Sequence, residues 1–369
     1  MLALAGCSST VPVTPEESVT SGTVAGAVLD APTATRLDEA IGRAMAEVSI
    51  PGAIVGIWGP AGDYVRTFGV ADKATRTPMQ TDFYSRVGSV TKTFTVTAML
   101  QLVDQGKLKL SDPISKYIPG VPSGEQITLR NLAQMASGLI TFDDVDEFAD
   151  AYLADPSRSF TPEQMLGYVR DTQLKFPPGT QFDYSNTNIL LLGLVVEQQS
   201  GQSLPDYIGG HILSPLKLTH TSFLTTSAFP EPHAQGYTTV DGRDRVATDW
   251  NPSWGWGAGN MISTLDDMRI WAHALATGTL LTPEIQRERL DSTVPMDPEG
   301  SAVYGLGLFN DDGWIGHSGS TFGYQTVVFY LPPTQTTLVF FINTDVPHGA
   351  GTTLAKAITS VISPDHIYG

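Results

Sequence analysis

The spacing of apolar residues near the start of the chain predicts a helix followed by a hairpin. Leu37, Ile41 and Met45 recur at intervals of four residues, which places them on one face of a helix. A Pro-Gly pair shortly after this run is a typical helix stop. The apolar runs 53–58 and 63–69 come next. We expect them to form two strands, because the segment between them is rich in turn residues.

Helical patterns dominate the middle of the chain. A helix is expected to start at Ser89 and to run to Gln105, and two more are expected over Thr161–Asp171 and Asn188–Ser200. The proline after Thr161 suits the first helical position, so Thr161 is the expected N-cap. Strand patterns are sparse between about residues 108 and 249.

Strand patterns return near the end of the chain. β-branched and aromatic residues are frequent in 304–308, 313–316, 325–331 and 336–343, and a helix is expected over 351–362. The layout predicts an α+β fold. Its antiparallel sheet is built from both chain ends and flanked by helices, with an inserted, mostly helical lobe.

This layout divides the chain into a leader, one folded domain and a short tail. The segment after residue 7 is rich in Ser, Thr, Pro and Gly and has no period, which is typical of a flexible tether. The expected divisions are a truncated lipoprotein signal with its tether (1–33), a sheet lobe (34–107 and 250–362), a helical lobe (108–249) and a tail (363–369).

The single cysteine, Cys7, lies in a sequence context typical of lipid attachment. It follows Leu4-Ala5-Gly6, which resembles the lipobox of bacterial lipoproteins, although most of a signal peptide is missing. We expect Cys7 to be lipidated and the protein to be secreted or anchored by lipid at the cell envelope, on the extracellular or periplasmic side. An incidental thiol is the alternative. No Cys/His set has zinc-ligand spacing, so no zinc site is expected.

The charge balance bears on the expected partners. The formal net charge is −17, from 38 acidic and 21 basic residues, and no cluster of Lys or Arg offsets it locally. Such a field repels phosphate backbones, so nucleic-acid binding is not expected. No apolar run approaches the length of about 20 residues that a membrane-spanning helix needs.

The start of the helix expected at Ser89 carries a candidate catalytic pair. In Ser89-Val90-Thr91-Lys92, positions i and i+3 share one face of a helix, so the hydroxyl of Ser89 lies beside the amine of Lys92. A serine needs an adjacent base to become a nucleophile, and a neutral lysine amine can serve. The sequence has a second copy of the pattern, Ser214-x-x-Lys217, where Pro215 interrupts the helix and a loop is expected.

Two further motifs lie far along the chain. Tyr184-Ser185-Asn186 could present its first and third side chains to one site, as i and i+2 do in an extended segment. The phenol of Tyr184 could move protons, and the amide of Asn186 could hold a substrate. His317-Ser318-Gly319 lies in an expected edge strand that could line a cleft and offer a backbone N–H to an oxyanion. We expect the other six histidines to be surface or core residues.

The three motifs together resemble the serine β-lactamase and penicillin-binding-protein-like family, in the branch that uses Tyr-x-Asn and His-x-Gly. That branch contains the Streptomyces-type D-alanyl-D-alanine carboxypeptidase, class C β-lactamases and related esterases. The resemblance runs from about residue 35 to 362. It includes Arg86–Lys92, Leu102–Leu108, Ala136–Leu139, Tyr184–Asn188 and Tyr304–Leu308.

The resemblance implies a role for each matched residue. Ser89 would attack an acyl carbon, Lys92 would take its proton, and Tyr184 would move protons with electrostatic support from His317. Asn186 would position both the substrate and Lys92. Backbone N–H groups of Ser89 and Ser320 would form the oxyanion hole. The residues that would contact the substrate are Trp254, Ser318, Gly319 and Phe309. The resemblance also implies a β-lactamase/transpeptidase-like fold and no metal or organic cofactor.

One departure from the carboxypeptidase pattern concerns carboxylate binding. An Arg follows the Tyr-Gly-Leu-Gly-Leu run there and binds the substrate's terminal carboxylate, whereas this chain has Phe309. The expected function is a serine acyl hydrolase, with a D-alanyl-D-alanine carboxypeptidase-like peptidase first, an esterase second and a β-lactamase third. The expected substrate is a peptidoglycan stem peptide, an ester or a β-lactam. The same motifs also allow a penicillin-binding protein with negligible turnover or a structural protein on an inactive hydrolase fold.

Overall fold

The computed structural model describes residues 27–240 and 242–369. Cys7 and most of the expected tether therefore lie outside the described residues. Helix α1 (Ala31–Glu47) begins three residues before the expected start of order at Ala34, and the carboxylate of Asp30 caps it. Within the described part of the chain, no helix is both long enough and apolar enough to cross a membrane.

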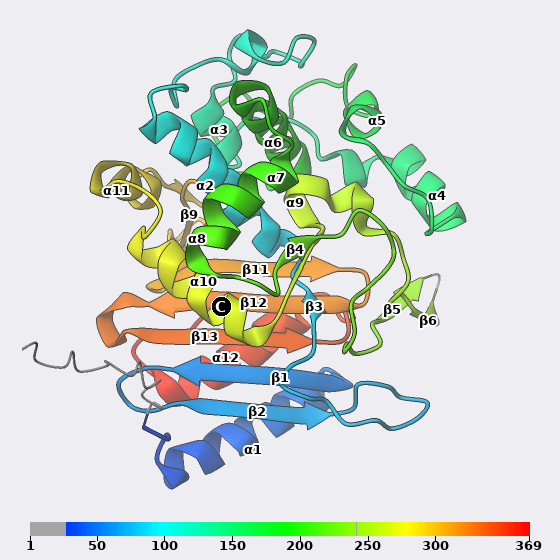
Figure 1. Cartoon of the computed structure of the whole chain (residues 1–369), viewed down its shortest axis with the longest axis vertical. Coiled ribbons are helices and arrows are strands. Elements are labelled where there is room, and N and C mark those ends of the chain that lie inside the picture. Colours follow the sequence, from blue (N-terminus) through cyan, green and yellow to red (C-terminus); the bar gives the residue numbers. More distant parts are fainter. Residues whose placement is uncertain (1–26, 241) are drawn as a thin grey trace, which may run out of the picture.

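Strands from both ends of the chain form one antiparallel sheet of eight strands (Figure 1). The two strands nearest the N-terminus lie beside the last strand of the chain, as the α+β layout predicts. The spatial order is β2 (Tyr64–Gly69), β1 (Gly52–Trp58), β13 (Thr336–Ile342), β12 (Tyr324–Leu331), β11 (Trp314–Thr321), β10 (Phe309–Asp311), β9 (Ala302–Tyr304) and β8 (Val294–Pro295).

Both faces of the central strands are covered. Ala53 and Val55 of β1 pack toward α1 and the C-terminal helix α12 (Ala350–Ile362), whereas Ile54 packs into the core on the opposite side. Helix α10 (Leu265–Thr277) lies on that second face, as Figure 1 shows. Because successive side chains of a strand point to opposite faces, two covered faces require the nearly continuous apolar runs seen in the sequence.

Helix α2 (Thr91–Asp104) lies on the second face of the sheet, packed between β11 and α6 (Asn186–Ser200). All its residues from Thr91 to Leu100 are buried. Phe94 stacks on Trp271 of α10 with 3.9 Å between ring centroids, and Trp271 Nε1 donates a hydrogen bond of 2.8 Å to Thr93 Oγ1. The first turn of α2, which carries the candidate base, is therefore enclosed by protein.

The segment between α2 and α10 is mostly helical and carries only short strands. Its helical elements are η2 (Ile114–Lys116), α3 (Leu129–Ala133), η3 (Phe142–Asp144), α4 (Asp146–Ala154), α5 (Pro162–Gly167), α6, α7 (Leu204–Ile208), η4 (Gly209–Leu213), α8 (Ser214–Leu216), η5 (Pro252–Gly255) and α9 (Trp256–Gly259). Its strands are β4 (Ser222–Phe223), β5 (Tyr237–Val240), β6 (Arg243–Val246) and β7 (Met261–Ser263). Strand β7 pairs with β4 and with β3 (Ser85–Arg86), which comes just before α2.

Three expected elements differ in the structure. The strand expected over 304–308 is wrong, because β9 ends at Tyr304 and the chain turns through Gly307, whose φ is +74°. A side chain at Gly307 would collide with Val96, so only glycine fits this turn against α2. Helix α5 has the expected N-cap at Thr161 but ends at Gly167, before the expected end. Strand β11 continues five residues beyond the expected 313–316.

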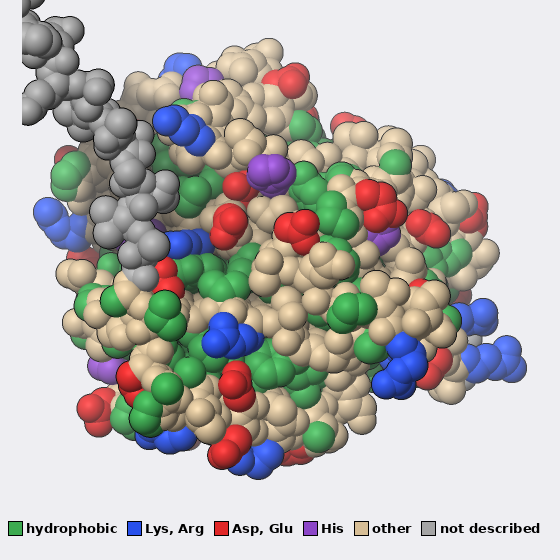
Figure 2. Space-filling view, turned by 60° about the horizontal axis from the view of Figure 1, so that its bottom comes forward, with side chains coloured by type: hydrophobic (Ala, Val, Ile, Leu, Met, Phe, Trp, Pro, Cys, Tyr) green, Lys and Arg blue, Asp and Glu red, His purple; other side chains and the backbone are tan. Residues whose placement is uncertain are grey.

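On the face shown in Figure 2, the charged side chains of the described residues are dispersed and form no dominant basic region. The face shown in Figure 2 carries Lys and Arg side chains singly or in small groups between acidic ones. Hydrophobic side chains lie between them over the same face.

Candidate active site

Ser89 and Lys92 lie at the junction of η1 (Gly88–Val90) and α2. Lys92 Nζ donates hydrogen bonds to Ser89 Oγ at 2.9 Å and to the carbonyl oxygen of Ala258 at 2.8 Å. The Lys92 side chain is fully buried, whereas Ser89 is partly exposed. The pair therefore has the geometry in which a neutral lysine amine can take the proton of the Ser89 hydroxyl, while Ser89 stays accessible from solvent.

Burial sets the protonation of Lys92. Loss of water around the amine lowers the pKa of Lys92 to about 7, although the carboxylate of Asp143 opposes the shift. The ring of Tyr184 lies 4.9 Å from Lys92 Nζ and adds a cation–π contact when the amine is charged. A large fraction of the amine is therefore neutral near pH 7 and able to act as a base.

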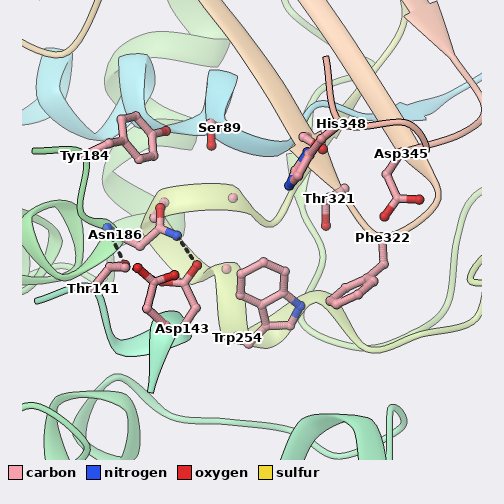
Figure 3. A pocket seen from close by; sticks show the side chains of 15 residues that line it. Ser89, Thr141, Asp143, Tyr184, Asn186, Trp254, Thr321, Phe322, Asp345 and His348 are labelled. Carbon is pink, nitrogen blue, oxygen red and sulfur yellow. Dashed lines mark hydrogen bonds between the residues drawn. The ribbon is translucent and has the colours of Figure 1, made fainter. Parts of the chain in front are cut away.

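Tyr184 and Asn186 reach the same site from the segment that starts α6. The Tyr184 hydroxyl points toward Ser89 in Figure 3, and burial raises the pKa of this phenol, so it stays protonated near neutral pH. Asn186 Nδ2 donates to Asp143 Oδ2 at 2.7 Å, and the Asn186 N–H donates to Thr141 Oγ1 at 3.0 Å. Tyr184 thus faces the nucleophile while Asn186 faces a short acidic loop.

His317 is almost completely buried in β11. Its Nδ1 lies against the carbonyl oxygen of Ser318, and its Nε2 lies 3.1 Å from the hydroxyl of Tyr304. Burial first, and the nearby Lys92 second, lower the pKa of His317 to about 3. The imidazole is therefore neutral at physiological pH and lies 6.3 Å, between ring centroids, from the ring of Tyr184.

Two glycines allow η1 and β11 to come into close contact. A Cβ added to Gly88, whose φ is +51°, would lie 2.9 Å from the backbone nitrogen of Ser320. A Cβ at Gly319 would collide with the carbonyl of Val87 and lie 2.9 Å from the backbone nitrogen of Ser89. Only residues without side chains permit this approach, which brings the backbones of Ser89 and Ser320 to one place.

Part of β11 has a free edge beside the nucleophile. Strand β10 pairs only with residues 314–316 of β11, so among the described residues the stretch from His317 to Thr321 pairs with no strand on that side. The expected edge strand is therefore an interior strand with an open half. An open strand edge can hold an extended substrate by backbone hydrogen bonds.

Two adjoining cavities meet at Ser89. The first has a volume of about 420 Å³ and the second about 230 Å³, and Ser89, Tyr184, Ser320 and His348 line both. The first also includes Asn186, Trp254, Thr141, Asp143, Asp144, Phe322 and Asp345. The second also includes Phe309, His317, Ser318 and Gly319. The structure thus brings all the sequence-predicted site residues except Cys7 to one place, with the Lys92 amine held behind Ser89.

A sequence profile of the family described as Beta-lactamase matches residues 22–362. The chain belongs to the beta-lactamase family. The family's members and structural neighbours are serine hydrolases and penicillin-binding proteins, so the fold and the general class of chemistry follow from membership.

Several proteins related to this beta-lactamase family member are known. PbpX of Bacillus subtilis strain 168, named for penicillin binding, is 29% identical over 75% of this chain and 66%, just under two thirds, of PbpX. A D-stereospecific amidohydrolase from Streptomyces sp. is 29% identical, with a TM-score of 0.81 over 89% of this chain and 98% of that one. A D-amino acid amidase from Ochrobactrum anthropi SV3, complexed with D-phenylalanine, is 25% identical. Its TM-score is 0.77 over 89% of this chain and 99% of the amidase.

The contacts of two residues bear on the roles that the beta-lactamase family resemblance implies. Within the described residues Asn186 Nδ2 donates to Asp143, and the Lys92 amine donates to Ser89 and to the Ala258 carbonyl, so Asn186 makes no direct hydrogen bond to Lys92. The electrostatic support of Tyr184 by His317 stays a prediction, and the buried, neutral imidazole would give it without a positive charge. Both side chains still line the cavities beside Ser89.

The second Ser-x-x-Lys copy has none of these surroundings. Instead of the expected loop, Ser214 begins the single turn α8, which ends at Lys217 with a φ of +57°. Both side chains are exposed. This copy therefore lacks the enclosed surroundings in which Ser89 and Lys92 lie.

Sequence reasoning missed several residues that line the first cavity. His348, expected to be a surface or core residue, faces the cavity opposite Asn186 in Figure 3, with Asp345 beside it. Asp143 and Phe322 also line the cavity. These residues lie in loops or, for Asp143, in the short helical turn η3, where no motif marks them, and only the fold brings them to Ser89. Within the described residues, no group of three or more His, Cys, Asp or Glu side chains is arranged to hold a metal ion.

We expect Ser89→Ala to abolish covalent labelling by a fluorophosphonate, because this reagent reacts with an activated serine hydroxyl. Intact mass spectrometry measures the labelling. Ser214→Ala is the matched control, since it removes the hydroxyl of the other Ser-x-x-Lys copy, and it should label like the wild type. Labelling of the Ser89→Ala variant to the wild-type extent would show that the nucleophile lies elsewhere.

We expect the rate of acylation to rise with pH through about 7, because the pKa of Lys92 lies there and only the neutral amine accepts the serine proton. Below that pH the rate should fall by about tenfold per pH unit. Stopped-flow measurement of the acylation burst with an activated ester gives this profile. Lys217→Arg should leave the profile unchanged, whereas a rate independent of pH from about 5 to 8 would exclude Lys92 as the base.

Proposed function

We propose that this chain hydrolyses small amides or esters that carry a free amino group on the acyl part and no carboxylate on the leaving group. The observation that carries this proposal is the charge of the two cavities that meet at Ser89. Asp143, Asp144 and Asp345 line the first cavity, and none of the described residues lining either cavity is Arg or Lys. A cationic substrate is therefore favoured and an anionic one is disfavoured.

The proposed reaction begins with proton transfer from Ser89 to the neutral amine of Lys92. Ser89 Oγ forms a bond to the carbonyl carbon, and the backbone N–H groups of Ser89 and Ser320 stabilise the oxyanion. As the bond to the leaving group breaks, the leaving atom receives a proton by way of the Tyr184 hydroxyl, and Lys92 replaces it. Water then attacks the acyl-enzyme with the same groups in reverse and releases the acid and the free serine.

The first cavity suits the acyl part of such a substrate. Besides its carboxylates, it contains Asn186 Oδ1, a buried acceptor that receives no hydrogen bond from the described residues. Trp254 and Phe322 form its aromatic side, with 6.0 Å between their ring centroids. Acceptors on one side and aromatic rings on the other fit an amino acid with an ammonium group and an apolar side chain.

The second cavity suits a neutral leaving group. Phe309 lines it and lies 4.2 Å, between ring centroids, from His317. The rest of its polar lining consists of hydroxyl and amide side chains and backbone, with His348 at the junction. A leaving ammonia or alcohol needs no cation, whereas the terminal carboxylate of a D-alanyl-D-alanine peptide does. The site therefore supports an amidase or esterase better than a carboxypeptidase.

The structural relatives support the same substrate class. Two of the similar structures are named as a D-stereospecific amidohydrolase and a D-amino acid amidase. We therefore place the amide of an apolar D-amino acid first among substrates, with the corresponding ester second.

The experiment compares D-phenylalanine amide with its N-acetylated form. We expect the free amine to be hydrolysed with the lower KM, because its ammonium group faces the carboxylates of the first cavity. Asp144→Asn should raise the KM of the free amine by roughly two- to fivefold, the range of exposed ion pairs, without changing that of the acetylated amide. Asp266→Asn, on the outer side of α10, is the charge-matched control.

Three results would oppose the proposal. Equal or better hydrolysis of the N-acetylated amide would remove the role of the ammonium group. Faster hydrolysis of a D-alanyl-D-alanine peptide than of either amide would favour the carboxypeptidase. A burst of one equivalent with penicillin, without turnover of any amide or ester, would identify a penicillin-binding protein that does not deacylate.

We expect Phe309→Arg to improve hydrolysis of a D-alanyl-D-alanine peptide relative to an ester, because Arg adds the cation that a carboxylate needs in the second cavity. The ratio of kcat/KM values for the two substrates measures the change. Phe309→Leu is the control, since it removes the ring without adding charge. An unchanged ratio in Phe309→Arg would show that this position does not select the leaving group.

A further inference from the structure

A second buried tyrosine, Tyr304, lies behind the residues that face the substrate. It is completely buried at the end of β9, and its hydroxyl lies 3.1 Å from His317 Nε2. Its ring packs edge to face against the rings of Tyr184, His317 and Phe309, at centroid distances of 6.4, 5.8 and 5.0 Å. Tyr304 thus packs against three aromatic residues that line the cavities without being part of the lining itself.

The hydrogen bonds of His317 define where its proton is. A backbone carbonyl can only accept, so the contact between His317 Nδ1 and the Ser318 carbonyl requires a proton on Nδ1. In a neutral imidazole the other nitrogen is then an acceptor. The Tyr304 hydroxyl therefore donates to His317 Nε2.

We propose that Tyr304 is a positioning residue that holds His317 as its Nδ1–H tautomer and keeps both ring nitrogens engaged away from Tyr184. With both nitrogens occupied, His317 offers Tyr184 neither a donor nor an acceptor. The hydroxyl of Tyr184 then remains directed to Ser89 and to the nearby Lys92 amine.

The charges around this pair support donation by Tyr304. Lys92 on α2 and Tyr184 before α6 face His317, and Arg289 on α11 (Pro283–Asp291) lies near Tyr304. Arg289 is buried, and its guanidinium donates to Thr97 Oγ1 at 2.9 Å and to the Leu306 carbonyl at 3.2 Å. Burial raises the pKa of Tyr304 despite the nearby Arg289, so the phenol keeps the proton that it donates to His317.

The first test is nitrogen NMR of the protein labelled with ¹⁵N-histidine. The His317 signals are those missing from His317→Gln. We expect a protonated Nδ1 and an unprotonated, hydrogen-bonded Nε2 in the wild type. In Tyr304→Phe the Nε2 signal should shift toward the value of an unprotonated nitrogen that receives no hydrogen bond. A protonated Nε2 in the wild type, or an Nε2 signal unaffected by Tyr304→Phe, would overturn the proposal.

The second test is a double-mutant cycle in the hydrolysis of an activated ester. We expect Tyr304→Phe to lower kcat by roughly 10- to 100-fold with little change in KM, because the groups at Ser89 lose their orientation. If Tyr304 acts through His317, then Tyr304→Phe combined with His317→Gln should lose no more than the worse single variant. Losses that multiply, or a wild-type kcat in Tyr304→Phe, would contradict this.

Tyr64→Phe is the matched control. Tyr64 is as buried as Tyr304 and donates a hydrogen bond of 2.6 Å to Asp38, but it lies on β2. The Tyr64→Phe variant should therefore keep the wild-type kcat, and a loss of kcat equal to that of Tyr304→Phe would point to general destabilisation. The kinetic test depends on the acyl-enzyme chemistry of the proposed function, whereas the NMR test does not. An inactive wild type would reject the proposed function, whereas the NMR result decides the tautomer by itself.

Discussion

The site depends on removing the amine of Lys92 from water. A hydrated lysine amine holds its proton at neutral pH and cannot accept another from a serine. Full burial lowers the pKa of Lys92 to about 7 without any need for a neighbouring cation. That burial requires a helix enclosed on all sides, and α2 meets this requirement through the sheet, α6 and α10. The hydrophobic core is therefore part of the catalytic apparatus as well as the source of stability.

A second constraint is the close contact between the nucleophile turn and the sheet. In the proposed mechanism Lys92 activates Ser89, and backbone N–H groups from two segments of the chain, those of Ser89 and Ser320, stabilise the oxyanion. The approach of η1 to β11 is possible only because Gly88 and Gly319 carry no side chains. Thr326 Oγ1 of β12 also donates to the Arg86 carbonyl at 3.2 Å, which fixes the chain before the nucleophile to the same sheet. The substrate cavity thus forms where two segments more than 200 residues apart meet.

The parts of this arrangement that follow from local sequence were predictable. Ser89 and Lys92 share one helical face through their spacing alone, and the apolar runs at both chain ends indicated the sheet. Local sequence pattern could not indicate that the chain turns at Gly307 instead of continuing as a strand. The contact that requires glycine at this turn is with Val96, which is distant in the sequence. The same applies to Asp143, Phe322 and His348, whose place beside Ser89 depends on loops from three different parts of the fold. The neutral state of His317 was also missed, because it results from burial and from its distance to Lys92.

The neutrality of His317 limits where the serine proton can go. Lys92 and His317 share one buried region, and each positive charge there raises the cost of the other. Burial and the charge of Lys92 lower the pKa of His317 to about 3, below the value of about 7 for Lys92, so the lysine is the favoured site for a proton. In the proposed mechanism, a proton taken from Ser89 therefore stays on Lys92 until it passes to the leaving group by way of Tyr184. An imidazole with both nitrogens engaged is suited to this arrangement, because it fills the space beside Tyr184 without competing for the proton.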